Sequence, residues 1–162
     1  MKYITLSVLI LILSGAGFGI TLEQTLTLER SAYHFTQEKG YTRILLRSIP
    51  TTAEPGKPEL PEKPVYLILP PGMKAVGLRV LEVKEDLIPG TFRVYPKQKD
   101  IPLNETPLWT HPNPAAYSSS IPYPEQVVEF TGQGDFQGQR IACLLVHPYR
   151  FTAHEGKLSF VS

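Results

Sequence analysis

The chain has 162 residues, sixteen basic and fifteen acidic side chains, and one cysteine. A chain of this length is expected to form a single domain. Its almost balanced charge excludes nucleic acid and anionic lipid as partners attracted by bulk charge. The one cysteine, Cys143, cannot form a disulfide within the chain, so the fold has to rely on its apolar core.

The first nineteen residues are typical of a secretory signal peptide. Lys2 supplies a positive charge, residues 4–13 form an apolar run, and mostly small residues follow up to Gly19. The apolar run is shorter than the roughly 18 to 20 residues that a membrane-spanning helix needs. We therefore expect cleavage after Ala16 or Gly19, a secreted or cell-surface location, and no stable membrane span in the mature chain.

Proline dominates the middle of the sequence. Fifteen of the sixteen prolines fall between Pro50 and Pro124. Each removes a backbone donor and restricts φ, which excludes a long helix there. Alternating and β-branched runs bounded by turn residues predict strands instead. In chain order, the expected strands cover residues 25–28, 32–36, 41–47, 65–69, 74–83, 91–95, 126–131, 140–147 and 157–161.

Short strands at this spacing predict an all-β fold, namely an antiparallel β-sandwich with proline-rich connections over residues 20–162. Turns between the strands are expected at Pro70-Pro71-Gly72, at Pro89-Gly90 and at Gly132-Gln133-Gly134.

One segment within this domain has a period of its own. Pro55, Pro58, Pro61 and Pro64 recur at every third position, which is the period of polyproline II. Such a pre-extended segment could be a ligand for an aromatic groove. We favour an extended crossover lying on the sandwich, because Leu60 provides an inward-pointing anchor and a strand follows directly.

Cys143 and His147 are the residue types of a nucleophile and its base. In an extended strand their spacing places them on one face but about 13 Å apart, at about 3.3 Å per residue, whereas catalysis needs hydrogen-bond contact. We predict that Cys143 is a small buried apolar residue and that His147 is a surface or capping residue. A cysteine enzyme using Cys143 is a less favoured alternative, which predicts inactivation by thiol alkylation.

The remaining polar residues predict no reactive site. His34, His111 and His154 lack zinc-type spacing, and the third glycine of residues 132–138 comes one position late for a dinucleotide loop. The spacing of the acidic residues singles out no acid/base pair. We therefore predict no catalytic residue, no metal site and no cofactor in this chain.

The run Gly56-Lys57-Pro58-Glu59-Leu60-Pro61, followed by an apolar strand that ends at Pro70-Pro71-Gly72, resembles the core motif of the N-terminal propeptide of gingipain-type cysteine peptidases, which belong to the caspase-like clan. Similar residues follow in the same order over roughly residues 40–162. They are Tyr95-Pro96, Tyr123-Pro124-Glu125, His147-Pro148-Tyr149 and Gly156-Lys157-Leu158. The motif residues of this resemblance are Gly56, Pro58, Glu59, Leu60 and Pro61.

The resemblance implies a β-sandwich prodomain that assists the folding of a following peptidase domain and keeps it latent. In that family a loop of the prodomain enters the active-site cleft and presents a basic side chain to a pocket for arginine or lysine. The corresponding loop here covers about residues 97–106. Lys97 and Lys99 are its basic residues, but Leu103 aligns with the inserted side chain, which implies a different pocket in the partner.

The catalytic His-Gly pair of such peptidases does not occur in this sequence. We expect that the chain does not hydrolyse peptides by itself and that its partner is a cognate cysteine peptidase domain of the same polypeptide. Residues 156–162 resemble a turn and a strand without a polar ending, so we expect a C-terminally truncated fragment of a peptidase precursor. The alternative is a cell-surface β-sandwich module for binding or adhesion, with no peptidase.

Overall fold

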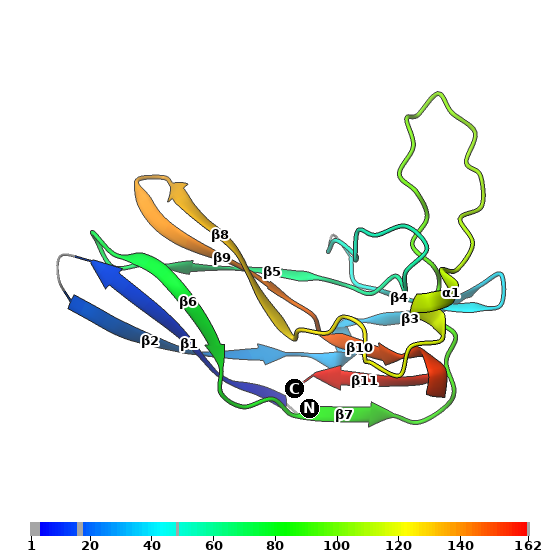
Figure 1. Ribbon diagram of the computed structural model, residues 1–162, viewed down its shortest axis with the longest axis horizontal. Helices are drawn as coiled ribbons and strands as arrows, with labels where there is room; N and C mark the ends of the chain where they lie inside the picture. Colours follow the sequence, from blue (N-terminus) through cyan, green and yellow to red (C-terminus); the bar gives the residue numbers. More distant parts are fainter. Residues whose placement is uncertain (1–3, 16–17, 48, 162) are drawn as a thin grey trace.

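The computed structural model describes residues 4–15, 18–47 and 49–161, and these ranges are almost entirely β-structure (Figure 1). The strands are β1 Ile4–Gly15, β2 Phe18–Leu28, β3 His34–Glu38, β4 Tyr41–Leu45, β5 Lys63–Ile68, β6 Lys74–Val80, β7 Glu85–Ile88, β8 Val128–Phe136, β9 Gln139–Val146, β10 Tyr149–Thr152 and β11 Lys157–Val161. The short helix α1, Pro114–Tyr117, and the single 3-10 turns Arg30–Ala32 and Ala153–Glu155 lie between them. The predicted all-β class is confirmed.

All strand pairs within the described sheets are antiparallel, and the strand orders are β2-β1-β6, β5-β9-β8, β10-β11-β7 and β3-β4. The first two sheets lie over one another at one end of the molecule (Figure 1). Leu69 and Ala142 from one layer pack with Ala75 from the other, and Leu22 and Leu78 complete this contact. The predicted β-sandwich is therefore confirmed.

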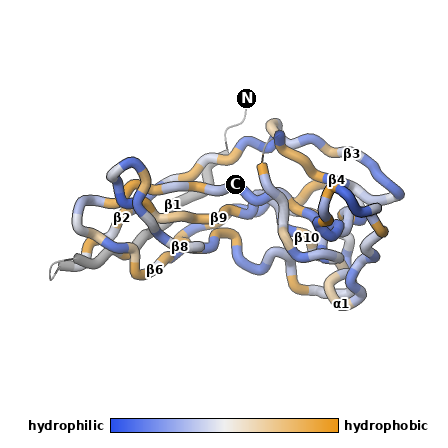
Figure 2. Tube along the Cα trace, turned by 90° about the horizontal axis from the view of Figure 1, so that it is seen from above, coloured by the Kyte–Doolittle hydropathy of each residue, from blue (hydrophilic) through white to orange (hydrophobic). Residues whose placement is uncertain are grey.

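A larger core fills the other end of the molecule. Tyr149 and Phe160 lie opposite each other on β10 and β11, with ring centroids 5.1 Å apart, and Tyr33 meets Tyr149 edge-on. All three are buried. Hydrophilic residues instead dominate β3 and its turn into β4, where the strand lies at an exposed edge (Figure 2). The buried apolar side chains of β10 and β11 thus form part of the main core.

Most of the expected strands occur near their predicted positions. The predicted strands 41–47, 65–69, 74–83, 126–131, 140–147 and 157–161 correspond to β4, β5, β6, β8, β9 and β11, whereas 25–28 is the end of β2 and 32–36 overlaps β3. The turn at Pro70-Pro71-Gly72 and the bend at Pro89-Gly90 also occur as predicted. Alternation is clearest in β9, where Ala142, Leu144 and Val146 are buried and the residues between them are only half-buried.

The prediction of a strand over residues 91–95 was wrong. This segment makes one parallel bridge with β4, in which the Thr42 N–H donates to the Arg93 carbonyl and the Tyr95 N–H donates to the Thr42 carbonyl. Strands β7 and β10 were not predicted, because β7 begins with two acidic residues and β10 has four residues. Both are strands because each pairs with β11, one on either side.

The predicted turn at Gly132-Gln133-Gly134 was also wrong, because these residues lie inside β8. The pairing of β8 with β9 shifts register between Phe130 and Gly132, which marks a bulge, a usual place for a glycine in a strand. The hairpin instead turns at Gln137 and Gly138, whose φ values of 49° and 76° are left-handed. The bulge therefore explains Gly132, which the sequence placed in a turn.

The expected signal peptide is described in part. Residues 4–15 form β1, which pairs with both β2 and β6, whereas Ala16, one of the two expected cleavage positions, lies outside the described residues. Cleavage and secretion stay predictions. No helix among the described residues is long and apolar enough to span a membrane.

Buried tyrosines predict a loss of stability in alkali. Burial raises the pKa of Tyr33 to about 12 and also raises the pKa of Tyr149, whereas both ionise near about 10 in an unfolded chain. This contribution to stability is complete below about pH 10 and is lost as the pH rises through the folded-state values. We expect the free energy of unfolding, measured by urea denaturation, to fall from about pH 10 to about pH 12.

Tyr149→Phe is the matched variant for this measurement. The Tyr149 ring is fully buried and its hydroxyl has no hydrogen-bond partner among the described residues, so the variant keeps the packing and removes only the ionisable group. Its stability should fall less steeply above about pH 10 than that of the parent chain. Equal slopes for both proteins would contradict this role of the buried phenols.

Candidate partner-binding face

A long loop, residues 97–110, projects from the sandwich and is called the arm below (Figure 1). The Glu105 N–H donates to the Pro102 carbonyl at 3.0 Å, and this turn leaves Leu103 fully exposed at the end of the arm. Lys99 is exposed on one leg, whereas Lys97 lies at the base with its side chain only 17% exposed and its Nζ 3.4 Å from Asp100 Oδ1. The three predicted contact residues therefore occupy three different positions.

Hydrogen bonds from Gln98 join the two legs of the arm. Its Nε2 donates to the Thr110 carbonyl at 3.2 Å, and its Oε1 accepts from the Thr110 N–H at 2.9 Å. The Lys99 N–H donates to Thr110 Oγ1 at 3.1 Å. The legs are thus tied together just above the sandwich, which restricts the conformations of the loop beyond them.

Aromatic rings support the base of the arm from below. Trp109 packs against Tyr95 and Tyr41, with ring centroids 5.5 Å and 6.1 Å apart. The Lys39 ammonium lies 4.3 Å from the centre of the Trp109 ring, an attractive cation–π arrangement. The second leg of the arm is therefore anchored on the sandwich by its own tryptophan.

Gly56 connects the first leg of the arm with the segment that directly follows the second leg. Its N–H donates to the Lys97 carbonyl, and its carbonyl accepts from the Asn113 N–H, each at 2.8 Å. Its φ is +82°, and a Cβ at this position would lie 3.1 Å from the His111 carbonyl oxygen. Glycine is required here because any side chain would strain the backbone and crowd the segment that follows the second leg.

The other motif residues hold this connection in place. Pro58 forms an isolated bridge with Pro96, and the Glu59 N–H donates to the Tyr95 carbonyl. Leu60 is fully buried, which confirms it as an inward anchor, whereas residues 54–57 form a turn in place of the expected extended chain. Pro61 bridges to Thr51. The motif that carried the family resemblance is thus the structural support of the arm.

The Glu59 carboxylate is buried beside the arm and forms an ion pair with Arg43. Glu59 Oε2 lies 2.9 Å from Arg43 Nη2 and accepts from Arg43 Nε at 3.0 Å. Arg43 Nη1 also pairs with Glu38, whose other oxygen accepts a hydrogen bond from the Tyr95 hydroxyl. These contacts join β3, β4, the motif and the segment before the arm into one polar network.

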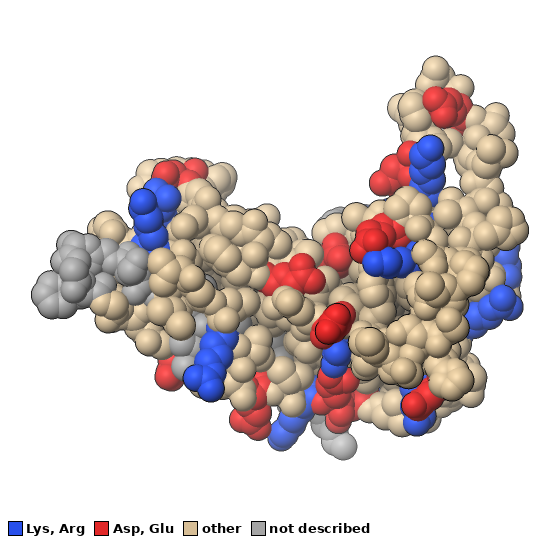
Figure 3. Space-filling view, in the orientation of Figure 1, with Lys and Arg blue, Asp and Glu red and all other residues tan. Residues whose placement is uncertain are grey.

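Beside the base of the arm lies a hollow of about 600 Å³, called the acidic hollow below. Glu54, Glu62, Glu125 and Glu129 line it, and among the described residues Lys57 is the one lysine or arginine in its wall. Figure 3 shows that the molecule is hollowed between the arm and the opposite end of the sandwich, with acidic side chains in the concavity. The concavity therefore carries an excess of negative charge.

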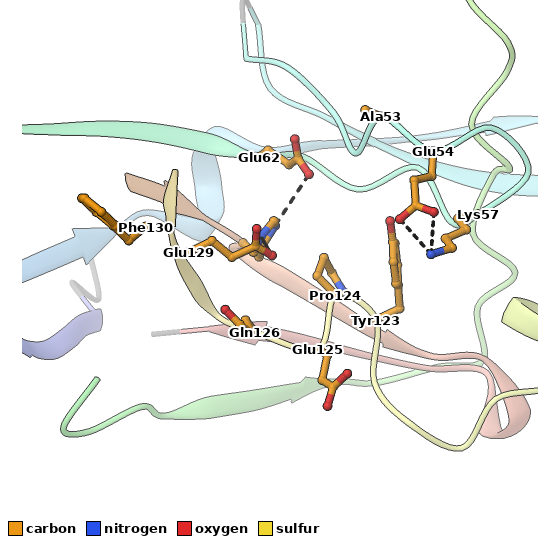
Figure 4. A pocket seen from close by; sticks show the side chains of 11 residues that line it. Ala53, Glu54, Lys57, Glu62, Tyr123, Pro124, Glu125, Gln126, Glu129 and Phe130 are labelled. Carbon is orange, nitrogen blue, oxygen red and sulfur yellow. Dashed lines mark hydrogen bonds and ion pairs between the residues drawn. The ribbon is translucent and has the colours of Figure 1, made fainter. Parts of the chain in front are cut away.

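Three residues far apart in the sequence meet at the inner end of the acidic hollow. Glu62 directly precedes β5, Glu129 lies on β8, and His147 directly follows β9. They are neighbours because the central strand β9 pairs Val146 with Lys63 on one side and Val128 on the other. Glu62 and Glu129 point into the same part of the hollow (Figure 4).

His147 lies between the two carboxylates. Its side chain is 2% exposed, Nε2 is 3.1 Å from Glu129 Oε1, and Nδ1 is 3.9 Å from Glu62 Oε1. Burial lowers the pKa of the imidazole, so that the ring is neutral at neutral pH. Burial, followed by the charge of Glu129, raises the pKa of Glu62. Neither shift is visible in the sequence, because it arises from neighbours brought together by the sheet.

The structure corrects the predictions for Cys143 and His147. Cys143 is only half-buried, because the alternation along β9 buries Ala142, Leu144 and Val146 and turns Cys143 to the other face. His147 is buried rather than on the surface, because it lies beyond the end of β9, where its N–H donates to the Val127 carbonyl. Among the described residues, no cluster of histidine, cysteine or carboxylate side chains is arranged to hold a metal ion.

Comparisons with known proteins extend this description. No protein-family model matches the sequence, and no curated protein matches it. A chain of gingipain K from Porphyromonas gingivalis, in a structure concerned with its zymogenic latency, is 23% identical, with a TM-score of 0.61 over 80% of this chain and 75% of that chain. A chain in the complex of the pro- and mature domains of RgpB from Porphyromonas gingivalis is 14% identical, with a TM-score of 0.59 over 80% of this chain and 68% of that chain. The chain therefore has the fold of these gingipain structures, as the resemblance to gingipain-type propeptides predicts.

Proposed function

We propose that this chain is the secreted prodomain of a gingipain-like cysteine endopeptidase, which assists the folding of the peptidase domain and keeps it latent. The observation that carries the proposal is the braced arm with an exposed leucine at its end, on a fold shared with gingipain structures. In this role the chain is not an enzyme by itself and is a part of a peptidase precursor. The signal peptide at residues 1–19 would export the precursor.

The physical basis of inhibition is the stiffness of the arm. A loop that is already ordered loses little conformational entropy when it docks, and the arm is held by Gln98, Trp109 and Gly56. The side chain at its end, Leu103, is free to enter a pocket of the partner. An apolar side chain in this place fits a cognate pocket that accepts an apolar rather than a basic residue.

Leu103→Ala should weaken inhibition of the cognate mature peptidase domain. Burying a leucine side chain contributes about 1.5 to 3 kcal/mol, so the inhibition constant should rise about 10-fold or more. The measurement is a titration of the peptidase with the purified chain, followed by hydrolysis of a fluorogenic peptide. Lys99→Ala tests the exposed basic residue of the arm by the same titration, and Lys97→Ala tests the lysine at the base of the arm.

Leu87→Ala is the matched control, because Leu87 is also exposed but lies on β7, away from the arm (Figure 1). This variant should inhibit like the parent chain. Equal inhibition by the Leu103 variant and the parent would show that the end of the arm does not make the inhibitory contact.

The coding sequence beyond residue 162 tests the assignment as a whole. A following domain with a His-Gly pair and a later nucleophilic cysteine is expected, and it supplies the cognate peptidase for the titration. A stop codon followed by unrelated genes, together with no inhibition of the mature gingipain K and RgpB domains, would support a cell-surface binding module instead.

A further inference from the structure

We propose that the acidic hollow binds a lysine or arginine side chain of the partner that the arm contacts. The identity of the partner rests on the proposed function, whereas the binding of a basic side chain rests on the hollow alone. Three observations carry the inference: unpaired carboxylates, a buried ring nitrogen without a donor, and the position of the hollow beside the arm.

Among the described residues, no lysine or arginine forms an ion pair with the two inner carboxylates, and Lys97 acts on Glu62 only through its charge, which offsets part of the rise in the Glu62 pKa. Among the ion pairs between described residues, Glu62 and Glu129 pair only with His147, which is neutral at neutral pH. The Glu62 side chain is only 16% exposed, and no donor of the described residues forms a hydrogen bond with its carboxylate. A carboxylate that has lost most of its water without gaining a partner is stabilised strongly by an added cation.

The orientation of His147 leaves a further acceptor at the same place. The Glu129 carboxylate can only accept, so the proton of the neutral ring lies on Nε2. Nδ1 then carries a lone pair, is buried, and has no hydrogen-bond partner among the described residues, because Glu62 Oε1 at 3.9 Å is beyond hydrogen-bond distance and is itself an acceptor. Glu62, Glu129 and His147 Nδ1 thus all present acceptors at the inner end, and the complementary ligand is a donor.

The outer end of the same hollow shows how a basic side chain is held. Lys57 Nζ lies 2.7 Å from Glu54 Oε2 and 5.5 Å from the centre of the Tyr123 ring (Figure 4). The other cations near the inner end are already engaged. Lys97 pairs with Asp100, and Arg150 pairs with Glu85 and donates to the carbonyls of Pro124 and Glu125. Among the described residues, the outer end of the hollow therefore has an ion-paired lysine, whereas no lysine or arginine forms an ion pair with Glu62 or Glu129 at the inner end.

The hollow lies next to the arm, which identifies the partner. Lys57 lies in the wall of the hollow, and its backbone carbonyl accepts a hydrogen bond from the Lys97 N–H at the base of the arm, at 2.8 Å. Both features face the concavity seen in Figure 3. A protein that contacts the arm and fills this concavity brings its surface against the hollow, so a basic side chain on that surface can enter it.

Nuclear magnetic resonance of the isotope-labelled chain tests the inference with small probes. The cationic probes are N-acetyl-lysine methylamide and N-acetyl-arginine methylamide, and N-acetyl-norleucine methylamide is the uncharged analogue. The cationic probes should shift the signals of the His147 ring and of Tyr123 saturably, whereas the uncharged analogue should not. The carboxyl titration of Glu62 should also move to lower pH with a cationic probe, because a nearby cation favours the charged form.

The double variant Glu62→Gln, Glu129→Gln preserves the shape of both side chains and should weaken binding of the cationic probes about tenfold or more, since it removes two charged contacts. Glu105→Gln is the matched control, because Glu105 is exposed on the arm and lies outside the hollow. Unchanged binding in the double variant, or equal shifts with the uncharged analogue, would overturn the inference.

This experiment needs no peptidase, so its outcome is independent of the proposed function. If the cationic probes bind and the chain inhibits no peptidase, the binding of basic side chains by the hollow is supported and the prodomain role is contradicted. If inhibition depends on Leu103 but the probes do not bind, the prodomain role is supported and the binding of basic side chains by the hollow is contradicted. If both hold, the double variant should also weaken inhibition, while Glu105→Gln should leave the binding of the probes unchanged.

Discussion

Glu59→Ala is expected to lower the free energy of unfolding by about 3 kcal/mol, the lower end of the range for breaking a buried ion pair. The Glu59 side chain is 8% exposed, and its removal leaves Arg43 without its buried partner. The loss should not be larger, because Arg43 is 27% exposed and keeps its contact with Glu38. Urea denaturation followed by circular dichroism measures the change.

Glu54→Ala is the matched control for this prediction, because Glu54 also pairs with a basic residue but is 63% exposed. An exposed ion pair contributes at most about 1 kcal/mol. Glu59→Gln separates charge from shape and should fall between the parent and Glu59→Ala. A loss of stability for Glu54→Ala as large as for Glu59→Ala would show that burial does not set the strength of these pairs.

Leu60→Ala is expected to be similarly destabilising, by about 3 kcal/mol, because a buried leucine replaced by alanine leaves a cavity. Leu60 is fully buried, and its backbone is held on both sides by Thr52, whose N–H donates to the Leu60 carbonyl and whose Oγ1 accepts from the Leu60 N–H. This rigid support limits how far the site can collapse. The melting temperature should fall by about 6 to 12 °C.

Leu103→Ala provides the same chemical change at a fully exposed position. It should alter the free energy of unfolding by less than about 0.5 kcal/mol, while weakening inhibition as proposed above. Leu60→Ala should instead destabilise the chain. It should weaken inhibition only under conditions in which the variant unfolds. A melting temperature that falls equally in both variants would mean that the end of the arm packs against the domain.

The motif of residues 56–61 shows how far local sequence reasoning reached. Its one leucine predicted an inward anchor, which the burial of Leu60 confirms, but its proline period predicted extended chain where residues 54–57 form a turn. That Gly56 joins Lys97 to Asn113 could not be predicted, because this contact depends on two segments about 40 and about 57 residues further on. The family resemblance indicated that the motif is important, and the structure shows that it supports the arm.

Cys143 and His147 show where local reasoning failed. Alternation fixes which residues share a face of β9 but not which face is buried, and it no longer applies to His147 beyond the strand. The face was decided by the sheet β2-β1-β6, which covers Ala142 and leaves Cys143 at the other side. Sheet packing therefore reversed the predicted burial of the two residues.

The sequence by itself determined the all-β class and most strands, because proline restriction and side-chain alternation act over a few residues. Only the tertiary structure decided the bracing of the arm and the acidic hollow. Glu62, Glu129 and His147 meet because β9 pairs with β5 and β8 in one register. Such pairing joins residues that are far apart in the chain, and no local pattern records it.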